Sequence, residues 1–236
     1  MGVRTVMAVG AHPDDIEILC AGTLAKYAKQ GSRVVMACIT NGNMGHAVIP
    51  PAELAQIRER EMRESADVIG AEVIWLGFPD EKVFDDQETR LKVVDALRVG
   101  RPDILITHSP SDYHPDHRMT SKLVFDASFL CTVPHIETEH PFHTKVASIL
   151  YMDTLAGLEF QPEIYVDVTE TFETKLEMLS KHQSQVRWLK EHDNIDILEF
   201  IEVVARFRGL QCNVKYAEGF TRLKAWPRMA PESLLP

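Results

Sequence analysis

Short apolar runs alternate with longer amphipathic segments along the first half of the chain. Continuous apolar runs predict four buried strands, at Val3–Ala11, Arg33–Thr40, Glu72–Leu76 and Asp103–Thr107. Helical spacing predicts three helices between them, at Ile16–Gln30, Ala52–Ile69 and Glu88–Val99. Unbroken apolar strands joined through helices indicate a parallel sheet covered on both faces. The fold class is therefore α/β, a Rossmann-like three-layer sandwich with a mostly parallel sheet.

The pattern is less regular after about residue 132. A loop rich in proline and histidine is expected over Pro134–His143. Two further strands are expected at Ser148–Met152 and Glu163–Val168, and two helices at Thr171–Glu191 and Ile195–Phe207. Because no linker composition or internal repeat interrupts the chain, we expect residues 1–236 to form a single domain.

Composition narrows the class of protein. The 236 residues are 45% hydrophobic and 25% charged, which is ordinary for a soluble globular protein. A net charge of −10 argues against a nucleic-acid partner and favours a small-molecule ligand. No apolar run approaches the roughly 20 residues of a membrane span. The four cysteines lack C-x-x-C spacing, so we expect a reduced, cytoplasmic setting and no zinc ribbon.

Histidine and aspartate cluster after two of the predicted strands. His12-Pro-Asp-Asp15 follows the first strand, and His114-Pro-Asp-His117 follows the fourth. Ligands of such sheets bind outside the carboxyl ends of the strands. A catalytic zinc site needs three nitrogen or oxygen ligands and one open position. His12 and Asp15 can supply two ligands from one turn, and His117, or else His114, can supply the third.

The neighbouring carboxylates suggest a division of labour. Asp14 and Asp15 lie in a non-helical turn, so their side chains should point in different directions. One can bind the metal while the other faces a metal-bound water as general base. Pro115 suits the first position of a helix, which places His117 in its first turn. Asp116 can then orient a histidine.

The sequence also has to be compared with two interpretations other than a metal site. Each motif alone is also typical of a helix start capped by aspartate, but capping does not explain both motifs at the end of one sheet. A nucleotide-binding Rossmann module is disfavoured because Gly10–Asp15 does not read G-x-G-x-x-G. Two carboxylates in that turn would also repel a pyrophosphate.

The two motifs resemble a known family. Ala11–Asp15 with Glu17, together with His114–His117, is similar to the zinc-dependent N-acetylglucosamine deacetylase superfamily (PIG-L/LmbE-like). Supporting similarities cover nearly the whole chain, at Asn41-Gly42, Ile57-Arg58, Glu61, Ile69-Gly70, Leu76–Asp80, His182–Gln185 and Ala217–Phe220.

The resemblance implies a role for each site residue. The metal ligands would be His12, Asp15 and His117. Asp14 would be the general base, and His114, held by Asp116, would stabilise the oxyanion or act as an acid. Substrate contacts would come from Arg58, Asp80 and Tyr113.

The implied reaction is removal of the N-acetyl group from an N-acetylglucosamine-type amino sugar or its conjugate, with release of acetate. The implied cofactor is Zn²⁺, although two histidines and a carboxylate also suit Fe²⁺. The alternative enzyme is a zinc amidohydrolase acting on another N-acylated amine, such as an antibiotic intermediate or a diacetylated disaccharide. Members of the family often assemble, so a homo-oligomer is expected.

Overall fold

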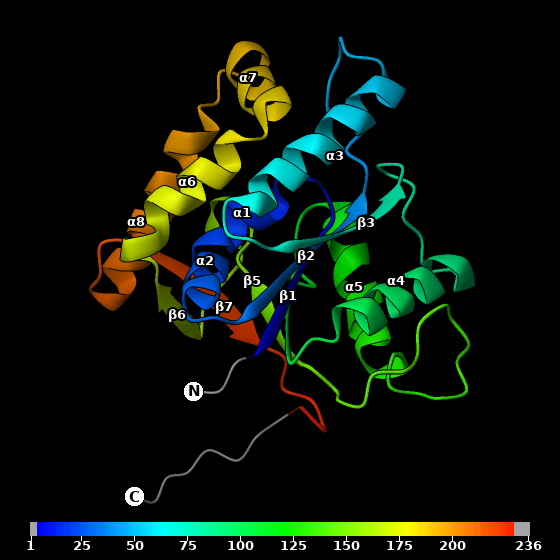
Figure 1. Ribbon diagram of the computed structural model, residues 1–236. Coiled ribbons are helices and arrows are strands. Elements are labelled where there is room, and N and C mark those ends of the chain that lie inside the picture. The colour runs from blue at the N-terminus through cyan, green and yellow to red at the C-terminus, as the bar shows by residue number, and fades with distance from the viewer. Residues whose placement is uncertain (1–3, 229–236) are drawn as a thin grey trace, which may run out of the picture.

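A single mixed sheet forms the centre of the computed structural model, which describes residues 4–228 (Figure 1). Its strand order is β3-β2-β1-β4-β5-β7-β6. The strands are β1 Thr5–Gly10, β2 Arg33–Thr40, β3 Glu72–Phe78, β4 Ile104–Thr107, β5 Ser148–Met152, β6 Ile164–Asp167 and β7 Ala217–Arg222. β7 runs antiparallel to β5 and β6, whereas the pairings from β3 through β5 are parallel. The predicted mostly parallel sheet is confirmed.

Helices cover both faces of this sheet, which confirms the three-layer arrangement. They are α1 Asp15–Leu19, α2 Ala21–Lys29, α3 Pro51–Asp67, α4 Gln87–Gly100, α5 Pro115–Leu130, α6 Phe172–Ser180, α7 Gln183–His192 and α8 Ile197–Cys212, with short 3₁₀ turns at η1 Leu155–Gly157 and η2 Thr169–Thr171. α1, α2, α3 and α6 lie on one side of the sheet, and α4 and α5 on the other (Figure 1). Within residues 4–228, no helix combines the length and apolar character that a membrane crossing requires.

The first strand shows why the apolar runs are unbroken. Val6 and Ala8 pack into the core beneath α1, α2 and α3, whereas Met7 and Val9 pack into the core beneath α4 and α5. Successive side chains of a strand point to opposite faces, so a strand buried on both faces must be apolar at every position.

Two predicted helices are each divided in the structure. The segment expected over Ile16–Gln30 breaks at Cys20, where φ is −146°. α2 then begins against the Glu218 carboxylate, which accepts hydrogen bonds from the backbone N–H groups of Gly22 and Thr23. The prediction of one continuous helix was wrong because this cap comes from a distant strand.

The helix expected over Thr171–Glu191 divides in the same way. α6 ends at Ser180, and His182 leaves the helical region with ψ 56° before α7 begins. Ser184, in the first turn of α7, donates to the Glu61 carboxylate through its backbone N–H at 2.7 Å and its hydroxyl at 2.6 Å. A cap supplied by α3 therefore fixes the start of α7.

Candidate metal centre

The two histidine-aspartate motifs meet at the carboxyl edge of the sheet. β1 pairs with β2 on one side and with β4 on the other, so the chain's crossover direction changes between β1 and β4. In α/β sheets, loops diverge at such a switch point and leave room for a ligand. The turn at 12–15 and the segment at 112–117 face each other across it.

Three side chains bring metal-binding atoms to nearly equal spacing. His12 Nδ1 lies 3.3 Å from His117 Nε2 and 3.4 Å from the nearer oxygen of Asp15. His117 Nε2 lies 3.3 Å from the other oxygen of Asp15. Ligand atoms about 2.0–2.1 Å from a tetrahedral zinc ion are separated by about 3.3–3.4 Å. The two imidazole nitrogens lie at this separation, and each lies 3.3–3.4 Å from one of the two Asp15 oxygens, so the three side chains are close enough to share one metal ion.

The charges at the centre favour a cation. Burial lowers the pKa of His12, but Asp15 and Asp116 outweigh burial and raise it to about 10. Burial also lowers the pKa of His117, but Asp15 and Asp112 outweigh burial and raise this pKa to about 9. Burial raises the pKa of Asp15, but the three surrounding histidines bring it well below its usual value. The carboxylates thus attract positive charge to this point, and a metal ion that binds here must displace protons from the two imidazoles.

Each candidate histidine ligand also contacts a carboxylate through its other nitrogen. Asp116 Oδ2 lies 3.4 Å from His12 Nε2, and Asp112 Oδ1 lies 3.1 Å from His117 Nδ1. Such contacts orient metal-binding imidazoles. The Asp116 carboxylate faces His12. Asp116 contacts His114 through its backbone N–H, which donates to His114 Nδ1 at 3.2 Å.

Asp112 was not among the candidates from the sequence. It precedes the His114 motif by two residues and carries no metal-binding pattern of its own. Its buried side chain also accepts a hydrogen bond from the His114 backbone N–H at 3.0 Å. The signal that could have found it is its position in the same strand-end segment as His117.

His108 lies beneath the candidate ligands at the end of β4. Its ring stacks on His117 with centroids 3.9 Å apart, and its Nε2 lies 3.1 Å from Asp15 Oδ2. Burial is the main cause that lowers its pKa to about 4. His108 is fully buried against Asp15 and His117, and its Nε2 also accepts the backbone N–H of Ala11 at 3.0 Å.

Asp14 is held beside the centre by a buried arginine. Asp14 has φ 118°, a left-handed conformation that is uncommon outside glycine. Arg58, on α3, lies 3.1 Å from Asp14 Oδ2 and also donates to the carbonyl oxygens of Pro13 and Gly42. Burial raises the pKa of Asp14 to about 6, against the opposing charge of Arg58. The arginine thus fixes this carboxylate at one orientation.

His114 is a hydrogen-bond donor toward the cavity. Its Nδ1 accepts the backbone N–H of Asp116, so the neutral ring carries its proton on Nε2. That nitrogen lies 3.5 Å from the Glu81 carboxylate. Burial, with the nearby charges of His12 and His117, lowers the pKa of His114. The ring is therefore suited to donate from Nε2 in its neutral form.

A cavity of about 390 Å³ opens above these groups. All three residues expected to contact substrate line it. Asp80 also accepts the backbone N–H groups of Gly42 and Met44, at 2.8 and 3.0 Å, which fixes the loop after β2. Tyr113 is 59% exposed, and its ring centroid lies 5.9 Å from that of His114. The structure brings the predicted site residues together around one cavity, and their individual roles remain predictions.

Some of the supporting motif residues, Glu17, Glu61 and His182, take part in buried polar contacts that join α1, α3 and the start of α7. Glu17 accepts the Ser65 hydroxyl at 2.6 Å and lies 3.0 Å from His182 Nε2. The Glu61 carboxylate accepts the Ser184 hydroxyl. The next residue, Gln185, lines the cavity. These contacts therefore fix α7 against α1 and α3.

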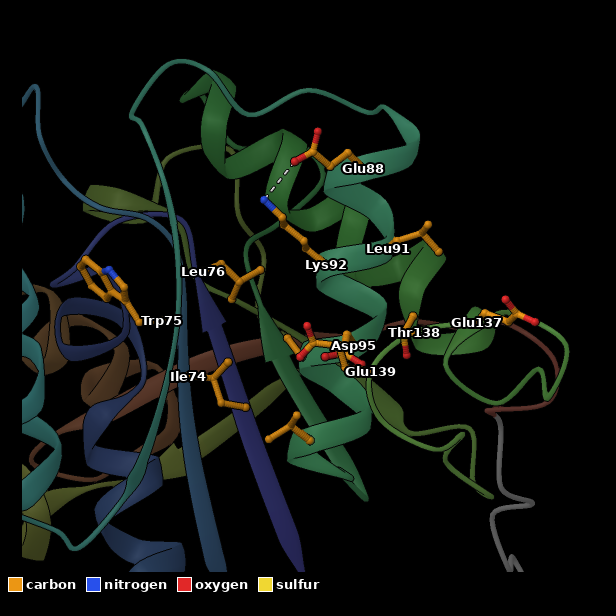
Figure 2. A pocket seen from close by; sticks show the side chains of 12 residues that line it. Ile74, Trp75, Leu76, Glu88, Leu91, Lys92, Asp95, Glu137, Thr138 and Glu139 are labelled. Carbon is orange, nitrogen blue, oxygen red and sulfur yellow. Dashed lines mark ion pairs between the residues drawn. The ribbon is translucent and has the colours of Figure 1, made fainter.

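A second cavity of about 450 Å³ lies between the edge strand β3 and α4 (Figure 2). Ile74 and Leu76 line it from β3, and Glu88 pairs with Lys92 at 3.0 Å on α4. It contains no residue of either histidine-aspartate motif. Asp95 and Glu139, which line this cavity, form with His140 a separate and largely exposed group of possible metal-binding atoms.

Solved structures share this architecture. N,N'-diacetylchitobiose deacetylase from Pyrococcus horikoshii, complexed with its inhibitor MPG, superposes with a TM-score of 0.79 at 28% identity, over 92% of this chain and 83% of that chain. GalB, the 4-carboxy-2-hydroxymuconate hydratase from Pseudomonas putida, superposes with a TM-score of 0.82 at 21% identity, over 98% and 100% of the two chains. The second likeness shows the fold alone.

Sequence similarity gives the family. Diacetylchitobiose deacetylase from Thermococcus kodakarensis is 28% identical over 92% of this chain and 82% of its own length. A family model described as GlcNAc-PI de-N-acetylase (PIG-L) matches residues 7–128, which is more than half of the chain and includes every candidate site residue from His12 to His117. The chain belongs to the PIG-L family of de-N-acetylases.

Proposed function

We propose that this protein is a metal-dependent deacetylase that removes the N-acetyl group from an N-acetylglucosamine-type amino sugar or its conjugate. The observation that carries the proposal is the close approach of His12, Asp15 and His117 to one another beside Asp14 in one cavity. In the reaction, water adds to the acetyl carbonyl carbon, the carbon–nitrogen bond breaks, and acetate and a free amine are released.

His12, Asp15 and His117 would hold the metal. When bound, the ion supplies a Lewis acid that lowers the pKa of a coordinated water to about 7. We favour zinc because two imidazoles and one carboxylate beside an open position are a common catalytic zinc set, although the same donors also suit Fe²⁺.

Asp14 would act as general base and then as acid. Arg58 occupies Oδ2 of this carboxylate, so Oδ1 is available to accept a proton from the attacking water. The same carboxyl group can pass that proton to the departing amine nitrogen. Proton transfer by a positioned group contributes about 10²–10⁴-fold to a rate.

His114 would stabilise the negative oxygen that forms on the acetyl carbon. Its Nε2–H is directed by the backbone N–H that Nδ1 accepts. Because this donor needs no protonation step, it can act over the whole neutral range. A single donor to such an oxyanion is worth about 10²–10³-fold in kcat.

The proposal is tested by acetate release from protein stripped of metal and reloaded with Zn²⁺ or Fe²⁺. The panel contains N-acetylglucosamine, a diacetylated disaccharide and N-acylated amines that lack a sugar. Turnover of amino sugars supports the proposal, whereas turnover confined to the other amides favours the alternative amidohydrolase. Stoichiometric metal binding without amide hydrolysis would overturn the proposal and favour a binding role. Hydration of unsaturated carboxylic acids, measured in parallel, would instead indicate a hydratase.

We also propose a cytoplasmic homo-oligomer. All four cysteines are free thiols, as a reducing compartment allows. Sedimentation equilibrium would test assembly, and a mass equal to that of one chain would contradict it.

A further inference from the structure

We propose that the apolar side chains of the active-site cavity bind an apolar group of the substrate, so that the preferred substrates are N-acylated amino sugars bearing an alkyl or aryl group. The inference rests on the proposed function and narrows its substrate class. Five aliphatic side chains line the cavity, namely Ile18, Leu19, Met44, Leu155 and Leu189, and we call them the apolar wall.

The apolar wall is only partly separate from the charged side of the cavity. Leu155 and Leu189 come from η1 and α7, which carry none of the candidate ligands, whereas Ile18 and Leu19 lie on α1 just after Asp15. An unsubstituted sugar presents hydroxyl groups, and a hydroxyl buried without a hydrogen-bond partner is costly. Aliphatic side chains offer no such partner, but they gain when they cover a methylene chain or an aromatic ring.

The core supports two of these residues. Ile18 and Leu189 both pack against a small buried cluster formed by Leu179, Ile197 and Ile201. This packing holds the exposed parts of both side chains in place at the cavity. The wall is therefore a preformed surface, as small-molecule sites usually are.

A buried ion pair holds the segment that carries Leu155. Arg208 Nε, on α8, lies 2.6 Å from Asp153 Oδ2, two residues before Leu155. Ala156 has φ 60°, a left-handed conformation that a non-glycine residue keeps only when its surroundings enforce it. The loop is thus fixed in a costly conformation that directs Leu155 into the cavity.

The apolar group could belong to the acyl chain or to the substituent on the amine. Two substrate series separate these sources. The first compares N-acetyl-, N-butyryl- and N-hexanoylglucosamine, and the second compares N-acetylglucosamine with its methyl, butyl and 4-nitrophenyl glycosides. We expect kcat/KM to rise along one series by roughly tenfold or more, the effect of a well-bound methylene or ring.

Leu155→Ser tests the wall directly. We expect it to reduce the preference along the responsive series about tenfold, measured as the ratio of kcat/KM between the most and least apolar substrates. The matched control is Leu158→Ser, since Leu158 is 66% exposed in the same loop and does not line the cavity. This control should keep the wild-type ratio. Equal metal content in all three proteins would show that the site is intact.

Two results would overturn the inference, namely kcat/KM that stays flat along both series, or a preference that Leu155→Ser leaves unchanged. If no acyl amine is hydrolysed, the proposed function fails independently of the wall. Calorimetric binding of glucosamine and of its 4-nitrophenyl glycoside then tests the wall alone. Tighter binding of the glycoside that Leu155→Ser removes supports it, and equal binding of the two compounds overturns it.

Discussion

Asp112 Oδ1 lies 3.1 Å from His117 Nδ1, and the Asp112 side chain is completely buried. The carboxylate fixes the ring so that Nε2 points to His12 and Asp15. A partner of this kind also makes the imidazole a stronger metal ligand. We therefore expect Asp112, in the loop after β4, to increase the affinity of the candidate site for its metal.

Asp112→Asn should weaken metal binding by about 10–100-fold, the usual effect of losing such a partner. Competition with a chromophoric chelator measures this affinity. Asp126→Asn is the matched control, because Asp126 lies on the same helix as His117 but pairs with Lys122 at 3.0 Å, away from the site. Wild-type affinity in Asp112→Asn would show that the contact does not tune the metal.

Asp14→Asn should keep the metal and reduce kcat by about 10²–10⁴-fold, because the amide cannot accept the proton of the attacking water. Asparagine is preferable to alanine here, since it tolerates the left-handed conformation of Asp14 at φ 118°. Steady-state kinetics and metal analysis of the same preparation check both parts. If kcat stays within threefold of wild type, Asp14 is not the general base.

The sequence was most informative where burial alone decides the structure. β2 and β5 begin and end as predicted, and the pairing of β1 with β4 brings the two motifs together. Strands buried on both faces must be apolar throughout, so their pattern does not depend on distant partners. The candidate ligands could be predicted for a related reason, because the turns that follow parallel strands lie at one edge of the sheet.

Features that depend on distant partners could not be predicted. β7 has no simple alternation, and its Glu218 is buried because it caps α2 and lies beside Lys175. Asp112 differs from a surface aspartate through its contacts with His117 and with the His114 backbone N–H. In both cases a local sequence does not reveal the tertiary contact that gives the polar residue its place.

Arg98→Met should lower the free energy of unfolding by at least about 1.5–3 kcal/mol, the worth of a single charged hydrogen bond. The buried guanidinium of Arg98 donates to the carbonyl oxygens of Cys131, Val133 and Ile136, and so holds the loop after α5. Urea unfolding measures the change. Arg101→Met is the control, because Arg101 is exposed. Equal stability of Arg98→Met and wild type would contradict this role.

His143 should make the folded protein less stable in acid. Its side chain is buried, with Nε2 3.0 Å from the Pro102 carbonyl oxygen, and burial lowers its pKa below the ordinary value of about 6.5. As the pH falls below that value, the unfolded chain binds a proton at this residue more readily than the folded chain does. The free energy of unfolding must therefore decrease.

His143→Gln removes this titration and keeps a side-chain N–H donor for the Pro102 carbonyl. We expect the stability of wild type relative to the variant to decrease from about pH 7.5 to about pH 5.5. Urea unfolding of both proteins at each pH measures the difference. Because both proteins keep the same metal centre and the same carboxylates, other proton uptake cancels in this comparison. A difference that stays constant or grows in acid would show that His143 does not titrate as its burial requires.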